Sequence, residues 1–365
     1  MGNTPQSLTQ LALQKFKTNL WGVLSLGFIV IVGLLALFAY VVAPDDSQNA
    51  NQMHISIHSK PPGFSVDMLT IPTLNTTTDS GISTWFFGKR NTDTEIPILS
   101  YTTTSTSLTY IPFTSSDISG IAQTIDVGTI SGDAFAKAYI QPQTFVLGTD
   151  KYGRDLLSRM LVGARISFSI GFIAVFISLL IGILLGSLAG YFGGYVDRVI
   201  MWFINVTWSI PTLLLVIAIT LALGKGYWQV FIAVGLTMWV EVARVVRGQV
   251  LGVKQMQYVT AARALGYGHG RIIWYHILPN IMAPIIVISA ANFAGAILIE
   301  SGLSFLGIGA QPPTPSWGAM IKDHYSYIIL GKPYLAVIPG LAIMLLVMAF
   351  MLVGNALRDA LDVKG

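Results

Sequence analysis

The chain has 365 residues, of which 53% are hydrophobic and only 10% are charged, and its mean hydropathy is +0.66. Soluble domains carry about 25% charged residues, so this composition excludes a soluble enzyme and indicates an integral membrane protein. The net charge of +4 is small and the basic residues lie near apolar runs, which argues against a nucleic acid partner. Because the chain contains no cysteine, it has neither a disulfide framework nor a thiolate metal site.

Apolar runs long enough, or nearly so, to cross about 30 Å of hydrocarbon occur six times along the chain. They predict an all-α polytopic membrane protein with six transmembrane helices. The fourth run is the least regular, because Glu241 and Arg244 lie near its end. The expected spans are 21–43, 166–191, 199–223, 228–246, 281–305 and 335–354.

The charges around the first run indicate the orientation of the chain. Lys15 and Lys17 precede this run and Asp45 and Asp46 follow it, so the positive-inside rule predicts a cytoplasmic segment at 1–20. The apolar run is too long for a cleaved secretory signal, which predicts a retained first transmembrane helix at 21–43. Six crossings then return the carboxyl terminus to the cytoplasm.

The same count places the short turn at 193–198 and the basic segment at 247–279 on the cytoplasmic side. Arg154, Arg159 and Arg165 would lie outside, against the rule, although long translocated loops escape it.

The region 44–145 is predicted to form an extracytoplasmic insert between the first two helices. It is polar and rich in threonine and serine, as in TLNTTTDSGIST, and it lacks a helical apolar period. Threonine favours strands, so a strand-rich or irregular small domain is expected. A disordered linker is the alternative. The aromatic residues of this region argue against it, because they favour some packing.

Glycines at 182, 186 and 190 share one face of the second expected span. Gly182, Gly186 and Gly190 are therefore expected to let another helix approach closely, and not to bind a ligand. Pro211 and Pro284 each remove one intrahelical hydrogen bond and predict kinks in two other spans.

Signals of catalysis are missing from the sequence. No phosphate-binding G-x-x-x-x-G-K-[ST] loop occurs, so ATP hydrolysis by this chain is not expected. The five histidines are scattered without a zinc pattern, and no metal site is predicted. An ion-coupled secondary transporter would place carboxylates deep in its spans, whereas Asp197, Glu241 and Glu300 all lie near predicted span ends.

The sequence YVTAARALGYGHGRIIWYHILPN at 258–280 lies between two apolar runs. It cannot lie in lipid, because its charged side chains and glycine-bent backbone would be left unsatisfied there. It must therefore lie at the membrane face. Periodicity leaves two alternatives, a docking surface for a protein that supplies energy or an interfacial helix against lipid headgroups.

Within this segment, Val259, Ala262 and Leu265 recur every third residue and predict a short apolar stripe on a helix. Gly266 is expected to bend the chain after it. A second short helix through the isoleucines is expected to end before Pro279, which cannot continue a hydrogen-bonded helix interior.

The segment resembles the EAA loop, with which permease subunits of bacterial ABC importers dock on their ATPases. The resemblance is carried by the spacing of Ala261, Ala262, Gly266, Leu278 and Pro279. It departs from the general pattern at Thr260, where the leading glutamate is common, and at His276, where many importers carry isoleucine although the peptide branch often has histidine. The resemblance assigns ATPase coupling to Thr260, Ala261, Ala262, Arg263, Leu265, Gly266, His276, Leu278 and Pro279.

Three further stretches resemble permeases of the dipeptide, oligopeptide and nickel group, of the DppC or OppC type. LGTDKYGRDLLSRMLVGARIS at 147–167 is similar to the signature before the second span, ESGLSFLGIGAQPPTPSWGAMI at 300–321 to the segment after the fifth, and NALRDALD at 355–362 to the carboxyl end. The signature residues are Gly148, Thr149, Asp150, Gly153, Arg154, Asp155, Ser158, Arg159, Gly163 and Arg165.

The resemblance implies an ABC permease core at 146–365 with five transmembrane helices, in the bacterial cytoplasmic (inner) membrane. It also implies a second, non-identical permease of the DppB or OppB type, an extracytoplasmic solute-binding protein, and two ATPase subunits or domains that bind ATP and Mg. This chain would bind no cofactor and would be no enzyme. Short peptides are the expected substrate, while nickel complexes, glutathione and other small solutes use similar permeases; no residue is assigned to substrate contact.

Overall fold

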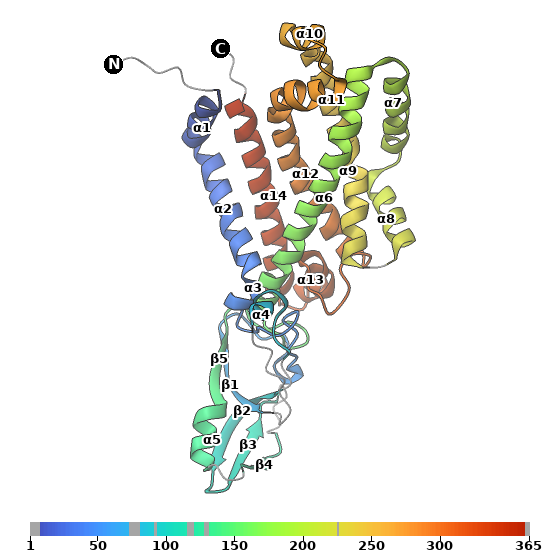
Figure 1. Cartoon of the computed structure of the whole chain (residues 1–365). Coiled ribbons are helices and arrows are strands. Elements are labelled where there is room, and N and C mark those ends of the chain that lie inside the picture. The colour runs from blue at the N-terminus through green and yellow to red at the C-terminus, as the bar shows by residue number, and fades with distance from the viewer. Residues whose placement is uncertain are drawn as a thin grey trace, which may run out of the picture. The chain divides into compact units, whose positions relative to one another are not determined.

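The computed structural model describes residues 8–72, 81–90, 93–114, 120–127, 131–224 and 226–361 (Figure 1). The chain forms two compact units. The first comprises Met1–Gly33, Ile166–Gln311 and Gly340–Gly365, and the second comprises Leu34–Arg165 and Pro312–Pro339. Among the described residues, five helical runs are long and apolar enough to cross a membrane: Leu20–Leu37, Leu156–Phe192, Tyr227–Val253, His269–Phe305 and Tyr334–Leu361.

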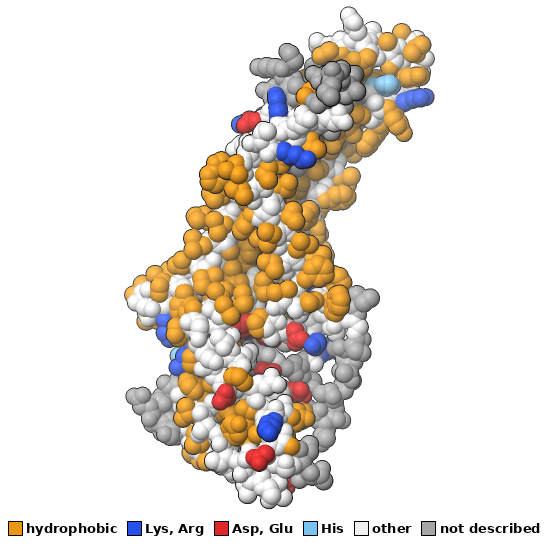
Figure 2. All heavy atoms as spheres, turned by 90° about the vertical axis from the view of Figure 1, so that its left-hand side faces the viewer, with side chains coloured by type: hydrophobic (Ala, Val, Ile, Leu, Met, Phe, Trp, Pro, Cys, Tyr) orange, Lys and Arg blue, Asp and Glu red, His pale blue; other side chains and the backbone are white. Residues whose placement is uncertain are grey.

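The first unit is a helical bundle. It contains α1 (Leu8–Thr18), most of α2 (Leu20–Leu37), α7 (Gly194–Trp208), α8 (Thr212–Leu223), α9 (Tyr227–Val253), α12 (Met282–Phe305) and large parts of α6 (Leu156–Phe192) and α14 (Tyr334–Leu361). Many of the exposed side chains of these helices are hydrophobic, as the face with α2 and α14 shows (Figure 2). Such surfaces are stable only in lipid or against another apolar surface.

The third expected span is not a continuous helix. Instead of one helix at 199–223, α7 and α8 are separated by a short break and bent by 91°. Pro211 precedes α8 and has no N–H to continue the hydrogen-bond ladder, which explains the position of the break. A sixth crossing is present only if this bent pair acts as one span.

α6 and α9 approach each other closely along a row of glycines. A Cβ atom built on Gly182 would lie 2.5 Å from Val242, one on Gly186 2.5 Å from the Ala243 carbonyl oxygen, and one on Gly190 2.8 Å from Val250. Every larger residue at these three positions would push the two helices apart.

The second unit contains a five-stranded antiparallel sheet. Its strands are β1 (Phe64–Ile71), β2 (Thr94–Thr103), β3 (Ser107–Pro112), β4 (Gln123–Asp126) and β5 (Ile140–Phe145), in the order β4-β3-β2-β1-β5. α5 (Gly132–Tyr139) begins at Ser131, whose side chain accepts a hydrogen bond from the Ala134 amide. Phe135 and Ala136 of α5 pack with Leu69, Ile98, Leu108 and Tyr110 in a small core. The strands lie within the expected insert.

Shorter helices complete the second unit. They are α3 (Ala39–Val42), η1 (Ile55–Ile57), α4 (Ile82–Phe87), α13 (Trp317–His324) and η4 (Tyr325–Ile328). A second cluster, formed by Ile57, Val66, Met68 and Phe145, packs η1 against β1 and β5. Two residues far apart in sequence, Tyr334 and Lys60, are joined by a 2.7 Å hydrogen bond from the tyrosine hydroxyl to the lysine carbonyl.

Candidate functional site

The segment after α9 folds into four short helical pieces, α10 (Gln257–Ala264), α11 (His269–Arg271), a π-helical turn η2 (Ile272–Ile277) and a 3-10 turn η3 (Leu278–Ile281). α10 is followed, after its C-cap Leu265, by Gly266, whose φ of +80° favours glycine. The Tyr267 amide donates to the Ala262 carbonyl at 3.2 Å and the Gly266 amide to that of Arg263 at 3.0 Å. These bonds form a Schellman motif, which fixes the direction of the bend.

The sequence predicted that the second short helix ends before Pro279, and this prediction is wrong. The helical path continues through η3 into α12, so that His269–Phe305 forms one apolar run of 37 residues. Pro279 lies in the first turn of η3, where a missing N–H is tolerated. The backbone of the segment is therefore continuous with the fifth expected span.

One face of the segment packs into the bundle. Val259, Ala262, Ile272, Ile277 and Ile281 are all buried, in a cluster that also contains residues of α6, α9 and α12. The five-residue interval between Ile272 and Ile277 would leave them on different faces of an α-helix. The π turn, with its i to i+5 hydrogen bonds, brings both to the same face.

The predicted stripe of Val259, Ala262 and Leu265 is wrong in its last member. Val259 and Ala262 are buried against the bundle, whereas Leu265 is 73% exposed. Leu265 is the residue at which α10 ends, so it no longer follows the helical period. The inward stripe belongs to this chain's own core.

The outward face is rich in aromatic and aliphatic side chains. Trp274 is 61% exposed and Tyr275 76% exposed, on a helical turn that the core cluster holds from behind. Exposed hydrophobic groups at this density mark a binding surface. We call these residues the outer surface of the segment: Met256, Tyr258, Leu265, Trp274 and Tyr275.

A hollow of about 960 Å³ adjoins this surface and has a cationic and aromatic lining. The ring of His276 stacks on that of Tyr267 with centroids 5.7 Å apart, and the Arg271 guanidinium lies 4.3 Å from the Tyr267 ring centroid. Trp274 and Tyr275 also line the hollow. The hollow is therefore lined by aromatic rings and by the cationic group of Arg271.

Contacts to α6 and α7 hold the segment in place. The Tyr191 hydroxyl and His269 Nδ1 are 2.9 Å apart, and Lys254 Nζ donates to the Gly190 carbonyl at 2.7 Å. Arg247 binds the Asp197 carboxylate through Nε at 2.5 Å and Nη2 at 2.7 Å. A bidentate pair of this kind fixes the angle between α7 and α9.

The remaining predicted residues are exposed or partly exposed. Thr260 and Ala261 lie on the solvent side of α10, and the Thr260 hydroxyl is 3.5 Å from the Met256 carbonyl in its own helix. Arg263 lies with its guanidinium 5.5 Å from the Tyr191 ring centroid. Leu278 packs at the margin of the core cluster, and Pro279 is exposed.

The signature at 148–165 lies in the second unit and is a tightly packed turn. Gly153 has φ of +75°, and a Cβ atom there would lie 1.8 Å from the His54 carbonyl oxygen. Gly148 has φ of +81° and a Cβ atom would lie 2.4 Å from the Lys60 carbonyl oxygen. Glycine is required at both positions by conformation and by space.

Asp150 is the centre of this turn. Its completely buried carboxylate accepts hydrogen bonds from the amides of Tyr152 and Arg154 and from Arg154 Nε, at 2.8, 3.0 and 2.7 Å. Arg159 Nε lies 3.7 Å away. One buried carboxylate thus faces two buried guanidinium groups and balances one of their two positive charges, while Asp45 and Asp323 also act on Arg159.

Polar side chains of the turn bind residues of the segment that precedes β1 and of the turn itself. They belong to Thr149, Asp155 and Ser158. The Thr149 hydroxyl donates to the Ile57 carbonyl at 2.5 Å and accepts from the Lys60 amide at 2.8 Å. Asp155 accepts from the Ser158 amide at 2.8 Å, and burial raises the pKa of its carboxyl although this bond opposes the shift. These groups are satisfied within the chain, which indicates a structural role.

The two family signatures of the second unit contact each other. Trp317 Nε1 donates to the Met160 carbonyl at 3.0 Å, and the same indole covers Gly163, where a Cβ atom would lie 3.1 Å from it. Lys151 Nζ lies 3.1 Å from Asp323 Oδ1. Arg165 donates to the Phe86 carbonyl. Sequence reasoning recognised both stretches but not their contact.

His324 lies beneath this contact and is almost completely buried. Its Nδ1 is 2.7 Å from the Met320 carbonyl, and the Lys151 amide donates to its Nε2 at 3.4 Å. Burial lowers the pKa of His324. A neutral imidazole that donates from Nδ1 and accepts at Nε2 satisfies both contacts.

Glu300 is completely buried in α12, although it lies near the end of that helix. The Ser304 hydroxyl donates to Glu300 Oε1 at 2.6 Å and accepts from the Ala310 amide at 3.1 Å. The two side chains thus hold the turn after α12 against the helix. Within the described residues, no group of three or more metal-ligating side chains is present.

Several residues of the site were not identified from the sequence. Tyr191 and His269 have no motif around them, and only the fold brings them together. Trp274 and Tyr275 stand inside the recognised segment, and two adjacent aromatics outside an apolar run are a signal that could have been used.

Comparison with known proteins agrees with these features. Residues 182–364 match the family model of the binding-protein-dependent transport system inner membrane component, and residues 7–62 match the N-terminal TM domain of oligopeptide transport permease C. Residues 63–181, which include the sheet and the whole of the first signature, lie outside these two matches.

Named relatives are similar over about 217 residues. The dipeptide transport system permease protein DppC of Alkalihalophilus pseudofirmus is 42% identical, over 60% of this chain and 71% of the relative. The glutathione transport system permease protein GsiD is 43% identical in Pectobacterium atrosepticum, over 60% and 72%, and 46% identical in Escherichia coli, over 60% and 71%.

Among solved structures, the inward-facing MetNI methionine ABC transporter aligns with 16% identity and a TM-score of 0.46, over 55% of this chain and 95% of that chain. This likeness is too low to add to the assignment. The family is assigned from the sequence relatives and from the matched family models. The chain belongs to the binding-protein-dependent transport system inner membrane component family, as an ABC importer permease of the DppC/OppC type.

Proposed function

We propose that this chain forms, with a second and non-identical permease, the path by which an ATP-driven importer moves short peptides across the bacterial cytoplasmic membrane. A solute-binding protein would deliver the peptide outside, and two ATPase subunits or domains would bind ATP and Mg inside. The peptide class rests on the relatives, which are named for dipeptide and glutathione transport.

The observation that supports energy coupling best is the outer surface of the segment after α9. Its inward face is packed in the core, its outward face presents Trp274 and Tyr275, and its backbone continues into α12. A force applied to this surface therefore acts on a whole span. A partner whose state changes with ATP could shift the permease between two conformations only through such differential contacts.

The distribution of charge in the first unit supports a cytoplasmic position for this end. Lys15 and Lys17 of α1, Arg358 of α14 and the basic residues of α10 and α11 belong to elements at the same end of the bundle (Figure 1). This is the distribution that the positive-inside rule describes. Both termini would then be cytoplasmic.

Uptake by proteoliposomes that contain the chain with its second permease and ATPases, in the presence of the solute-binding protein, tests the proposal. We expect ATP-dependent uptake of labelled di- and tripeptides, measured in competition with glutathione and nickel complexes. The double variant Trp274→Ala, Tyr275→Ser should lose ATPase copurification, while Trp85→Ala, an exposed tryptophan of the second unit, should not. Normal ATPase copurification and normal ATP-dependent uptake in the double variant would contradict the role of the outer surface.

An ion-coupled secondary transporter is the alternative, and the burial of Glu300 in α12 keeps it open. Glu300 is bonded to Ser304 at the end of the helix, which favours a structural role. Uptake that survives removal of ATP but stops when an ionophore collapses the proton gradient would support this alternative.

For the insert we propose one of two roles, docking the solute-binding protein or covering the outer gate, and a clean excision tests both. Phe64 and Phe145 are paired across β1 and β5, so their backbones are adjacent. Replacement of 65–144 by a two-residue Asn-Gly turn would reconnect them without strain. Unchanged uptake with intact assembly would contradict both roles. The remaining explanation would be that the insert packs on the second permease.

A further inference from the structure

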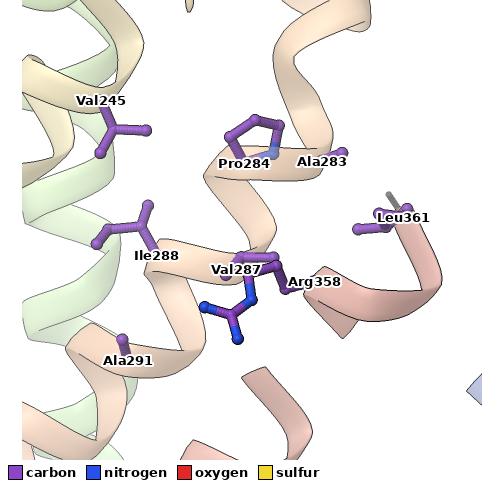
Figure 3. Close-up of a pocket in the computed structure, with 8 residues that line it drawn as sticks. All are labelled: Val245, Ala283, Pro284, Val287, Ile288, Ala291, Arg358 and Leu361. Atoms are coloured by element: carbon purple, nitrogen blue, oxygen red, sulfur yellow. The ribbon is translucent and has the colours of Figure 1, made fainter. Parts of the chain in front are cut away.

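An apolar cavity of about 420 Å³ lies between α9, α12 and α14 in the first unit (Figure 3). Its lining is aliphatic except for one guanidinium group. The residues are Val245, Ala283, Pro284, Val287, Ile288, Ala291, Arg358 and Leu361.

The sequence explains why the helices separate here. At Gly354 the helices α14 and α12 are in close contact, since a Cβ atom on this glycine would lie 3.3 Å from the Ala290 Cβ. One turn closer to the end of α14, the facing side chains of α12 include Ala283 and Pro284, which are too small to fill the space. The cavity is therefore built by small residues between two long helices.

Arg358 lies on the face of α14 that borders this cavity. Ala356 and Ala360 are buried with Phe16 of α1, and Arg358, two residues from each, lies on the opposite side of the helix. Figure 3 shows its side chain reaching from α14 across the α12 residues that line the cavity. Its Nε lies 3.8 Å from the Asp359 carboxylate, but both groups are well exposed, so this pair is weak.

The position of Arg358 along α14 defines its depth. It lies in the last described turn of a 28-residue helix that is apolar over most of its length. In the orientation of the proposed function, on which this step rests, that turn is at the headgroup level of the cytoplasmic leaflet. Anionic lipids of this leaflet are attracted by basic groups between membrane helices.

We propose that this cavity is a binding site for an anionic phospholipid. The phosphate binds the Arg358 guanidinium by charge-assisted hydrogen bonds, and an acyl chain fills the aliphatic lining. A peptide is a poor occupant, because its backbone amides and carbonyls would find no hydrogen-bonding side chain other than Arg358 in the lining. The lipid would hold α12 and α14 at a defined separation.

Native mass spectrometry of the purified full-length chain tests the proposal. Phosphatidylglycerol and phosphatidylcholine with identical acyl chains are added at equal concentration. We expect preferential retention of phosphatidylglycerol, reduced about fivefold in Arg358→Gln, the factor that corresponds to about 1 kcal/mol for one basic residue near a membrane surface. Ala291→Phe, which fills the cavity from an exposed position, should reduce retention of both lipids.

The matched control is Arg198→Gln, since Arg198 is an exposed arginine of α7 that does not line the cavity. An equal loss in this control, equal retention of the two lipids by the unmodified chain, or displacement of the lipid by dipeptides would overturn the proposal. The readout is binding and not uptake, so a failure here is distinguishable from a failure of the proposed transport function.

Discussion

The signature turn of the second unit and the segment after α9 use similar residues in opposite ways. At 148–159 the charged and polar side chains are buried and bind one another, with Asp150 as the shared acceptor. In the segment after α9 the buried side chains are aliphatic, while its basic and aromatic groups face outward. The first stretch therefore has its polar partners within the chain, and the second leaves its aromatic side chains Trp274 and Tyr275 exposed.

The glycines sharpen this comparison and give the largest expected effect. Gly153→Ala should prevent folding or lower the apparent melting temperature strongly, because the new Cβ atom would overlap the His54 carbonyl oxygen. The measurement is fluorescence-detected size exclusion of the heated protein in detergent. A variant that melts like the unmodified chain would show that this turn can relax.

Removal of the shared acceptor should have the next largest effect. Asp150→Asn removes the carboxylate that directly pairs with the buried Arg154 and Arg159 guanidinium groups, a cost of about 3–5 kcal/mol. The control is Asp46→Asn at the exposed pair with Lys89, where a loss of about 1 kcal/mol or less is expected. Similar losses in thermal stability for both variants would contradict the difference between the buried and the exposed pair.

Gly266→Ala should have a moderate effect on stability. Its φ of +80° is as positive as that of Gly153, but no atom lies within 4 Å of the added Cβ. Only the conformational cost of about 1 kcal/mol remains. We expect near-normal melting together with weaker ATPase copurification if the bend positions α10; a melting temperature as low as that of Gly153→Ala would refute the comparison.

A pH effect is expected at His324. Burial lowers its pKa in the folded state, so the unfolded chain binds a proton more readily. The stability contribution of the neutral imidazole is fully present above the unfolded pKa of about 6.5 and is lost as pH falls below it. The difference in melting temperature between the unmodified chain and His324→Asn should shrink from pH 8 to pH 5; a constant difference would contradict this prediction.

The smallest effect on stability is expected for the outer surface itself. Trp274→Ala should leave the melting temperature almost unchanged, because the side chain is 61% exposed. ATPase binding, measured by copurification, should nevertheless fall severalfold, as for an aromatic anchor at an interface. Strong destabilisation would show that Trp274 belongs to the core.

The sequence was most informative where local physics determines the structure. Long apolar runs predicted the helices at Leu20–Leu37, Tyr227–Val253 and Tyr334–Leu361 well, because length and hydropathy suffice for a span. Threonine-rich chain predicted strands, but not the order β4-β3-β2-β1-β5, which depends on non-local pairing. The break before Pro211 was expected only as a kink, and its 91° bend is set by packing.

The burial of individual side chains depends on tertiary packing, which the motifs do not determine. Leu265 fits an apolar period, yet it lies where α10 ends and is therefore exposed. Glu300 lies near a helix end, yet the turn that follows folds back and buries it with Ser304. The error at Leu265 comes from extending the helical period past the end of α10, whereas the burial of Glu300 depends on a turn that the sequence does not predict.

The π turn at Ile272–Ile277 has a consequence for the phase of the helix that follows it. Its wider turn lets residue 277 sit above residue 272, and from there Ile277, Ile281 and Ile285 stay aligned toward the core at intervals of four. Deleting one residue within it would restore α-helical winding and keep this alignment. Deleting one residue after it would rotate everything downstream by about 100° relative to the outer surface. Within this segment, the π turn is therefore the position where a one-residue deletion preserves the phase of α12.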